Sequence, residues 1–503
     1  MINVIAAQSV DLNTSLGLGT ILHSLLALLV CLHLLLKPRD ARTSLIWIIF
    51  TITLPIVGPL SYVLFGINTV PNKGWQKQYS DSIFQKSRRG HARSRNPLVT
   101  IAEHKNSVRV TPLDPDILSL NRILDRLCAK HPLLGGNEVK ILEPAERAIE
   151  AMFLAIRKAK KHIHLSTYIF EDDVIGKRLM DLLIARANDG VEIRVLYDAF
   201  GSALPSLRQF FWRHRHIPNL QLIGFSQANM FKRKFQLNLR NHRKLLIIDG
   251  THAFTGGINF HDVYLTKNTQ PGVIDYHFSI RGPIVNELQY TFLRDWYYMT
   301  DIAPEDLLVP RFFPLARSVG NSAIRLLNSG PTRNETDLAL DSYFAAVNLA
   351  HRQIIIVTPY FVPPEPLILA LRQAAFRGVE VKILVPSANN HPTLRLASQA
   401  LYAGLLKTGV RIFERESPFI HAKAFLVDDT AAIIGSTNID PRSLFLNYET
   451  NLLVLDADFT ARLKHVVLED FAHAHEIVYA EWRNRSRLRQ FAENFFNLFH
   501  PIA

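Results

Sequence analysis

One eight-residue pattern occurs twice in this chain and constrains its fold more than any other feature. Residues 242–249 read HRKLLIID and residues 421–428 read HAKAFLVD, so each copy has a histidine, a lysine two places later and an aspartate five places after that. Six residues further on, each copy continues with two small residues and an asparagine, GGIN at 256–259 and GSTN at 435–438. A single copy often occurs by chance, but a doubled match at fixed offsets indicates two related structural units.

The sequence around the two patterns repeats as well. Residues 150–201 and 341–386 each read as a helix, an apolar strand, a second helix, a glycine turn and a second strand. Gly190 and Gly378 are 188 residues apart, and the two histidines are 179 apart, so the order is kept while loop lengths change. We expect an α/β protein with two similar lobes, at 136–320 and 321–503, each with a mixed, largely parallel sheet flanked by helices.

Each eight-residue pattern is short, rich in branched apolar residues and bounded by turn formers, which predicts a strand. Side chains two apart on a strand share one face and lie ~6–7 Å apart. His242 therefore points the same way as Lys244, and His421 the same way as Lys423. Asp249 and Asp428 complete the two candidate catalytic sets, but their odd offsets place them at strand ends, where bracing the turn is the simpler role.

These residue types suit chemistry at a phosphate group. Imidazole exchanges a proton near neutrality and attacks phosphorus, while lysine supplies a compact positive charge. We expect Asn259, Asn438, Gly257 and Ser436 to bind the substrate phosphate through amide and backbone donors. Two facing copies would give a phosphodiester a nucleophile and a proton donor. This chemistry requires no metal and no cofactor, and the two cysteines form no zinc motif.

A histidine of this kind needs a carboxylate that fixes its tautomer. Glu449 lies 28 residues after His421, and Asp275 lies 33 residues after His242, each at the edge of an expected strand. We therefore predict that Glu449 orients His421 and that Asp275 orients His242. An ordinary surface carboxylate is the alternative reading for Asp275.

The amino-terminal region, residues 1–70, is predicted to anchor the chain in a membrane. Residues 17–36 carry no formal charge over 20 positions, which is enough to cross a bilayer as a helix. Residues 44–64 are also uncharged but contain Pro55, Gly58 and Pro59, so this segment either spans with a kink or re-enters. A cleaved signal peptide is disfavoured because residues 1–16 have no Lys or Arg and no cleavage site follows.

Charge indicates the partners. The formal net charge is +13, which favours anionic partners such as phospholipid headgroups or nucleic acid. Residues 71–135 are predicted to be a basic juxtamembrane linker leading into the first lobe, lying on anionic lipid or simply solvated. Basic residues flank the second hydrophobic segment on both sides, so the positive-inside rule alone does not decide the orientation. If the second segment is re-entrant, the connector and the catalytic region both face the cytoplasm, and this is the arrangement that we expect.

Three further stretches mix cations with aromatic residues. These are RQFFWRHRH (208–216), MFKRKF (230–235) and the tail 481–500, in which Phe491, Phe495 and Phe499 have amphipathic helical spacing. Each stretch fits either a surface that rests on anionic lipid or packing against the catalytic body.

The doubled pattern resembles the phospholipase D superfamily, and other stretches resemble bacterial cardiolipin synthases over nearly the whole chain. These stretches are PIVGPLSYVLFG (55–66), STYIFEDDVIG (166–176), VLYDAFGS (195–202), NHRKLLIIDG (241–250), TPYFVPPEPL (358–367) and GSTNIDPRSLFLNYETN (435–451). Two positions depart from the family pattern. Asn390 precedes His391 where an aspartate is common, and the sequence around Asp275, IDYHF, differs from the usual one.

The resemblance implies one active site between two lobes, in an enzyme of the bacterial inner membrane. The implied reaction transfers a phosphatidyl group between two phosphatidylglycerol molecules, giving cardiolipin and glycerol through a phosphohistidine. The family precedent makes His242 the nucleophile and His421 the acid and base. The expected partners are phosphatidylglycerol and cardiolipin, with no nucleic acid; protein partners are unknown.

Other functions use the same residues. A hydrolytic phospholipase D would differ in how well it excludes water, and another phosphatidyltransferase would accept a different lipid, such as phosphatidylethanolamine. A phosphodiesterase nuclease is disfavoured by the hydrophobic amino terminus and by the lack of an obvious stacking platform. A non-catalytic membrane scaffold is disfavoured because both His/Lys sets are intact.

Overall fold

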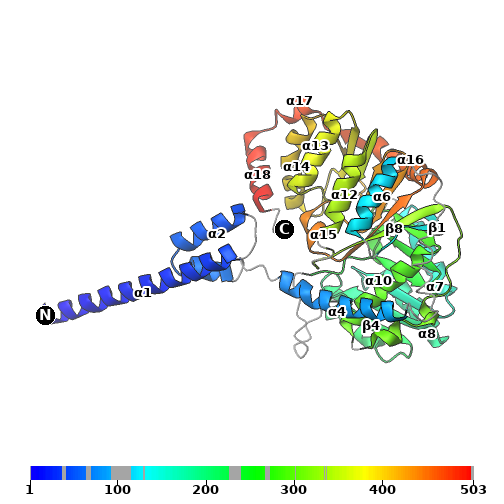
Figure 1. The fold of residues 1–503 in the computed structure, drawn as a ribbon, viewed down its shortest axis with the longest axis horizontal. Helices are drawn as coiled ribbons and strands as arrows, with labels where there is room; N and C mark the ends of the chain where they lie inside the picture. The colour runs from blue at the N-terminus through cyan, green and yellow to red at the C-terminus, as the bar shows by residue number, and fades with distance from the viewer. Residues whose placement is uncertain are drawn as a thin grey trace. The chain divides into compact units, whose positions relative to one another are not determined.

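The structure is a computed structural model that describes residues 2–36, 41–63, 70–91, 115–128, 131–225, 239–266, 272–300, 302–332, 335 and 337–499. The chain forms two compact units, Met1–Asn72 and Lys73–Ala503 (Figure 1).

The amino-terminal unit contains the helices α1 (Ile2–Leu36), α2 (Ala41–Thr53) and α3 (Val57–Ser61). Within the described residues, α1 holds the one stretch long and apolar enough to cross a membrane, Gly19–Leu36. The second hydrophobic segment is broken, as its prolines predict, because Pro55 cannot continue the hydrogen-bonded ladder of α2. With 13 residues, α2 is ~20 Å long and falls short of the hydrocarbon thickness.

Close contacts fold the broken segment back on itself. A Cβ atom at Gly58 would lie 2.5 Å from the carbonyl oxygen of Phe50, so only glycine allows this approach. The ring of His33 on α1 is hydrogen-bonded to the hydroxyl of Tyr62 at 2.6 Å. The three helices of this unit therefore pack as a bent hairpin and not as two straight spans.

Within its described residues, the second unit, Lys73–Ala503, is built on one sheet of fifteen strands, and the two halves of this sheet mirror each other in strand order. Outward from the centre, the first half runs β1 (Leu134–Leu142), β7 (His277–Arg281), β6 (His252–Gly256), β5 (Leu245–Ile248), β2 (His162–Thr167), β3 (Glu192–Asp198) and β4 (Leu220–Phe225). The second half runs β8 (Ser322–Ser329), β14 (Glu449–Leu455), β13 (Ala431–Gly435), β12 (Ala424–Val427), β9 (Gln353–Val357), β10 (Glu380–Pro386), β11 (Arg411–Arg415) and β15 (Ala474–Glu476). The antiparallel pair β1–β8 joins the halves.

The sheet is mixed, as predicted, but the expectation that it is largely parallel is wrong. Of the fourteen neighbouring strand pairs, only β2–β3, β3–β4, β9–β10 and β10–β11 are parallel. Strands β5, β6 and β7, and likewise β12, β13 and β14, follow one another around each His/Lys pattern. Their first connections are tight turns, and such turns join only antiparallel neighbours.

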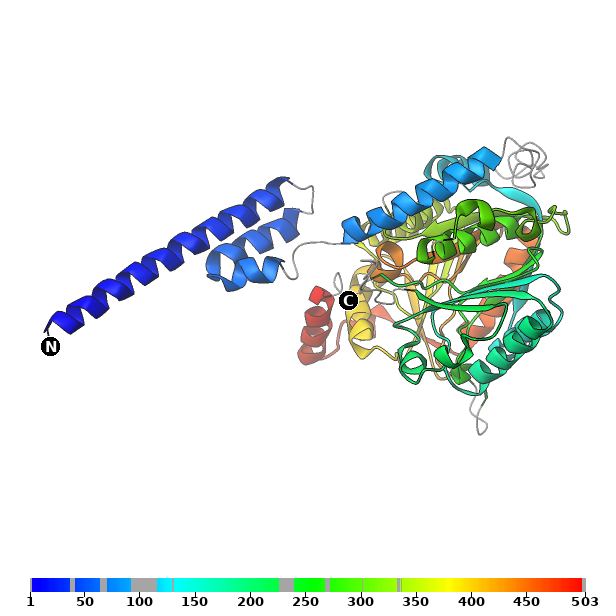
Figure 2. The same cartoon turned by 90° about the horizontal axis from the view of Figure 1, so that it is seen from below.

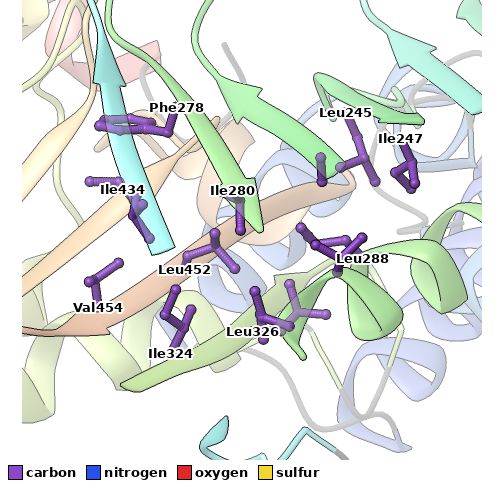
Figure 3. Close-up of a cluster of buried hydrophobic side chains, with 14 of the residues drawn as sticks. Leu245, Ile247, Phe278, Ile280, Leu288, Ile324, Leu326, Ile434, Leu452 and Val454 are labelled. Carbon is purple, nitrogen blue, oxygen red and sulfur yellow. The ribbon is translucent and has the colours of Figure 1, made fainter. Parts of the chain in front are cut away.

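Helices cover both faces of the sheet (Figures 1 and 2). A shared core lies beneath α10 (Ile284–Met299) and α16 (Ala457–Ala472), and two separate cores lie under α7 (Ala145–Arg157) and α8 (Val174–Asn188), and under α12 (Leu338–Leu349) and α13 (Glu365–Phe376). Figure 3 shows side chains of β5, β7, β8, β13, β14 and α10 in the shared core. Because this core uses residues of both halves, the lobes form one body.

The helix α4 (Val70–His91) corrects the prediction of a solvated or lipid-bound linker at this place. Lys77 is fully buried, with its Nζ atom 2.5 Å from Asp81 and 3.0 Å from Asp295 of α10. Phe84 is also fully buried, and Arg88 pairs with Glu287 of α10 at 2.6 Å. Since the buried face of α4 is largely charged, no apolar period revealed it. Residues 92–114 lie outside the described residues.

Two of the basic–aromatic stretches pack on the body. Phe210 and Phe211 belong to the core of the first lobe, while Trp212 is 62% exposed. The stretch 230–235 lies outside the described residues. The tail forms the amphipathic helix α18 (Arg487–Phe499), which packs against α14 (Pro392–Leu406) and leaves Leu488 and Phe491 exposed.

Candidate active site

Each motif histidine lies three residues before its strand, beside the chain of the other lobe, so the strand predicted over each pattern begins only after the lysine. The backbone N–H of His242 donates to the carbonyl oxygen of Tyr448 at 3.0 Å, and that of His421 donates to the carbonyl oxygen of Ile274 at 2.7 Å. Parallel bridges at Asn241–Tyr448 and Ile274–Ile420 fix both junctions. The residues that follow Tyr448 and Ile274 are Glu449 and Asp275, so each carboxylate is delivered to the opposite lobe.

The pairing of carboxylates with histidines is therefore crossed, and the predicted pairing within each lobe is wrong. His242 Nδ1 lies 2.9 Å from Glu449 Oε1, and His421 Nδ1 lies 2.7 Å from Asp275 Oδ2. These pairs are 207 and 146 residues apart in sequence. Distance along the chain could not reveal them because the two junctions depend on how the lobes dock.

The two lysines bring both sets into one electrostatic site. Lys244 Nζ donates to the carbonyl oxygen of His242 at 2.9 Å, and Lys423 Nζ lies 2.9 Å from Nδ1 of His421. Lys423 helps to lower the pKa of His242, and Lys244 helps to lower the pKa of His421. Each lysine acts on the histidine of the other lobe, so the four side chains lie close enough to influence one another electrostatically.

Burial sets the protonation of this site. Burial, followed by the charges of Lys244 and Lys423, holds the pKa of His242 well below its ordinary value. Burial also raises the pKa of Glu449 to about 7. Both shifts oppose a charged imidazolium–carboxylate pair, so His242 is a neutral imidazole.

The pKa values of His421, Lys244 and Lys423 are also shifted in the direction that favours the neutral form. Burial and Lys423 lower the pKa of His421 to about 4. Burial lowers the pKa of Lys244 to about 7 and that of Lys423 to about 8, against the opposing effect of Glu449 and Asp275. The site thus holds amines that gain or lose a proton near neutral pH.

The two asparagines of the small-residue turns, Asn259 and Asn438, are both buried, and their role as phosphate ligands stays a prediction. Asn259 Oδ1 accepts a hydrogen bond from the backbone N–H of Ile169 at 3.2 Å, and the Asn259 side chain is also hydrogen-bonded to Tyr264. Asn438 Oδ1 has no hydrogen-bond partner among the described residues. Such a buried polar group is costly unless a ligand or water satisfies it.

The small residues before the asparagines serve the carboxylates, so the prediction that Gly257 and Ser436 bind phosphate is wrong. Their backbone N–H groups donate to Tyr276 and Thr450, and the Ser436 hydroxyl donates to Glu449 Oε2 at 2.6 Å. A Cβ atom at Gly257 would lie 1.9 Å from the Asp275 carboxylate. Gly257 therefore leaves space for the Asp275 carboxylate, and Ser436 donates a hydrogen bond to the Glu449 carboxylate.

Asp249 and Asp428 brace the strand ends, so listing them in the catalytic sets is wrong. Asp249 accepts three backbone N–H groups from residues 160–162, at 2.7–3.0 Å. Asp428 accepts the same three bonds from residues 351–353, at 2.8–3.2 Å. Both lie at the far ends of β5 and β12 from the histidines, with φ near +50°.

Four residues near the histidines were not among the candidates. Arg442 helps to lower the pKa of His242, and Arg240 is nearly buried with its guanidinium over the ring of Phe200. The ring of Tyr168 lies 4.9 Å from that of His242, and the ring of Tyr360 lies 6.3 Å from that of His421. Arg240 lies two residues before His242 in the sequence, so an extended chain would place both side chains on the same side, and this spacing could have identified it as a candidate.

The departure at Asn390 lies at the edge of this region. The Tyr360 hydroxyl donates to Asn390 Oδ1 at 2.8 Å, so an asparagine fills the place with a neutral acceptor. In the described part of the chain, no group of three or more His, Cys, Asp or Glu residues is arranged to hold a metal ion.

Known proteins of one family match this chain in sequence. Residues 152–296 and 343–471 match the family described as cardiolipin synthase, PLD-like domain, and residues 25–66 match the phospholipase D-nuclease N-terminal family. The cardiolipin synthase of Geobacillus kaustophilus (strain HTA426) is 34% identical over 97% of this chain and 94% of its own length. Cardiolipin synthase A of Pseudomonas putida (strain F1) is 33% identical over 95% of this chain and 96% of its own.

The fold also matches a solved structure. Phosphatidylserine synthase of Haemophilus influenzae Rd KW20 superimposes with a TM-score of 0.58 at 16% identity, over 76% of this chain and 97% of its own. At this identity the match concerns the fold alone. With the doubled His/Lys pattern, the crossed site and relatives matched along almost their whole length, the chain belongs to the cardiolipin synthase family of PLD-like proteins.

Proposed function

We propose that this protein is a cardiolipin synthase that transfers a phosphatidyl group from one phosphatidylglycerol to another, releasing glycerol. The observation that carries the proposal is the crossed site, in which each histidine is held by the carboxylate of the other lobe. Two oriented imidazoles and two ammonium groups around one space suit a double displacement at a single phosphorus atom.

In the first displacement, Nε2 of neutral His242 attacks the phosphorus of phosphatidylglycerol. Its Nδ1–H donates to Glu449, which leaves the Nε2 lone pair free. The bond between phosphorus and the headgroup glycerol oxygen breaks, and His421 gives that oxygen a proton. The products are glycerol and a phosphatidyl group bound to His242.

In the second displacement, the headgroup hydroxyl of another phosphatidylglycerol attacks the same phosphorus. Neutral His421 accepts the hydroxyl proton, the nitrogen–phosphorus bond breaks and cardiolipin leaves. The pKa of His421 is about 4 in the substrate-free protein, so the acid role requires the anionic phosphodiester to raise it. Substrate binding would thereby load His421 with the proton that the first step uses.

The charge that develops at phosphorus is assigned to Lys244 and Lys423, with Asn259 and Asn438 as neutral donors. Because these cations lie inside the site, we propose that turnover does not depend on an added divalent metal. Cardiolipin formation that persists in excess chelator would support this point, and a strict requirement for Mg²⁺ or Ca²⁺ would contradict it.

The lipid partners follow from the same chemistry. Both substrate and product are anionic phospholipids, which suits a chain of net charge +13 that carries an apolar amino-terminal helix. We place the catalytic body on the cytoplasmic side of the bacterial inner membrane. Protease accessibility in sealed vesicles of known orientation tests this placement.

The test of the reaction uses purified protein and phosphatidylglycerol labelled in its headgroup glycerol. We expect equimolar glycerol and cardiolipin, and no product from the His242→Ala variant. His465→Ala is the matched control, because His465 is 78% exposed on α16. Phosphatidic acid as the main product would identify a hydrolase, and product formed only with added phosphatidylethanolamine would identify a different acceptor.

A further inference from the structure

A groove of about 820 Å³ lies in the first lobe, away from the histidines. It runs between α7, the strands β1, β7 and β6, and the extended segment Pro314–Val319. Gly250 and Thr251 of the β5–β6 turn line it, whereas His242 precedes β5 at the other end of that strand. The proposed reaction makes no use of this groove.

The second lobe has a helix at the corresponding place. The helix α6 (Pro115–Leu127) packs against α12, beside which Figure 1 shows it, and it contacts β8 through an ion pair. Leu120 and Leu124 enter the core of this lobe. Arg325 of β8 pairs with Asp125 of α6 and donates to Asn121 at 2.7 Å. An amphipathic helix with an acidic residue therefore covers this face of the second lobe.

Strand register shows that the groove is the equivalent face. Gly256 and Gly435 occupy the same place in the two repeats, and they pair with His277 of β7 and Asn451 of β14. Two residues further along these strands lie Ser279 and Leu453, which are therefore equivalent. Lys140 pairs with Ser279, and Arg325 pairs with Leu453. Lys140 in the groove thus corresponds to the arginine that binds α6, and α7 corresponds to α12.

The groove is more basic than its covered counterpart. Lys140, Lys158, Arg281 and Arg317 line it, and none of the described lining residues is acidic. Lys140 Nζ also lies 2.9 Å from Glu138 Oε1, which partly neutralises its charge. The positive charge of the groove therefore comes mainly from the other three cations. The position equivalent to Arg281 is Leu455, an apolar core residue in the second lobe.

Apolar residues between these cations remain exposed. Leu154 of α7 is 48% exposed and Leu315 is 65% exposed, and the sheet side of the groove includes Phe254. An apolar floor bordered by positive charge matches a ligand that presents an apolar stripe and carboxylates together.

We propose that this groove binds an acidic amphipathic helix of a partner protein, in the way that the second lobe binds α6. The proposal rests on the equivalence of the two faces and on the charge of the open one, and it is independent of the proposed reaction. A helix is favoured over a lipid because the occupied counterpart holds one. Its carboxylates would meet Lys158, Arg281 and Arg317, and its apolar stripe would cover Leu154.

The probe is a fluorescent, acidic form of the α6 peptide, PDILSLNRILDRL with Arg122→Glu and Arg126→Glu, added to the full-length protein in detergent micelles. We expect saturable binding, measured by fluorescence anisotropy. The double variant Lys158→Glu/Arg281→Glu should weaken it by about tenfold or more, as reversal of two charges at a docking surface does. A peptide with Asp125→Lys should also bind more weakly.

Arg462→Glu, an exposed charge reversal on α16, is the matched control and should leave peptide binding unchanged. The thermal unfolding midpoints of all variants establish that they are folded. Absence of binding at ~1 mM peptide, or equal binding by the double variant, overturns the proposal. Displacement of the peptide by soluble short-chain phosphatidylglycerol in the His242→Ala background would assign the groove to lipid and also overturns it.

Discussion

A neutral imidazole at His242 follows from its surroundings. The ring is buried beside two ammonium groups, and its carboxylate partner has a pKa of about 7. These conditions disfavour an imidazolium, which has no lone pair with which to attack phosphorus. Glu449 therefore acts mainly by holding the ring in one tautomer and orientation.

The variant Glu449→Gln tests this role. The amide keeps the shape of the side chain but favours the wrong tautomer of His242, so we expect kcat for cardiolipin formation to fall by about 100-fold or more with little change in KM. Glu469→Gln on α16, at a carboxylate 64% exposed, is the control. Less than a twofold loss in the Glu449 variant would remove the carboxylate from the mechanism.

Binding of the phosphate group should weaken as pH rises. The pKa values of Lys244 and Lys423, about 7 and about 8, lie below the ordinary value for lysine. Both amines are charged at lower pH and become neutral as pH rises through these values, so attraction to the anion is then lost.

A short-chain phosphonate analogue of phosphatidylglycerol measures this effect, because its single negative charge does not titrate in the same range. We expect its dissociation constant to increase at least about threefold between pH 6.5 and pH 9. A dissociation constant that is flat over this interval would show that the lysines stay charged.

The residues of the proposed reaction carry a local sequence pattern, whereas the pairing of each histidine with its carboxylate has no such pattern. The His/Lys pairs and Asn259 carry a local pattern that survives any docking of the lobes. The crossed carboxylates depend on contacts 146 and 207 residues apart, and Arg442 enters through the short helix α15 (Pro441–Phe445), which has no spacing relation to His242.

Among the elements, α4 connects to the site through buried charges. Lys77 pairs with Asp295, whose other oxygen lies 2.5 Å from Arg243, the residue between His242 and Lys244. Removing the Lys77 charge leaves carboxylates buried and short of a partner. We expect Lys77→Met to destabilise the catalytic body by about 3 kcal/mol.

Thermal unfolding followed by circular dichroism measures this loss. Lys86→Met is the matched control on the same helix, because Lys86 is exposed. Equal midpoints for the two variants would mean that α4 does not depend on the buried ion pair.

The turn after β12 offers a second comparison. Asp428 accepts three backbone N–H groups, while the adjacent Asp429 is half exposed and pairs only with surface cations. We expect Asp428→Ala to cost about 2 kcal/mol and Asp429→Ala about 0.5 kcal/mol or less, measured by denaturant unfolding. Loss of turnover in a fully folded Asp428→Ala protein would return this aspartate to the catalytic set.

Elements with an apolar period were predictable, and those held by charge were not. The two helix–strand repeats and the amphipathic tail helix form as expected. The sequence predicts a linker in place of α4 because the buried face of this helix carries Lys77 and Arg88 beside Phe84. The sequence overestimates the parallel content of the sheet because helical crossovers produce only four parallel strand pairs, and every other neighbouring pair in the described residues is antiparallel.

At the scale of the whole molecule, the two halves form one catalytic unit. Each half provides one histidine and the carboxylate that orients the other histidine, and both share a hydrophobic core. Neither lobe has a complete site. In the proposed reaction, one half provides the attacking group and the other half provides the proton donor.

The most direct test of this account is to trap the covalent intermediate. The purified protein is mixed with phosphatidylglycerol labelled with ³²P at its phosphate, quenched in alkaline denaturant, and the labelled histidine is identified by peptide mapping. The account predicts that label is carried by His242, that it is still present in His421→Ala and that it is absent from His242→Ala. Label on another residue, or cardiolipin formed at the wild-type rate by His242→Ala, would contradict it.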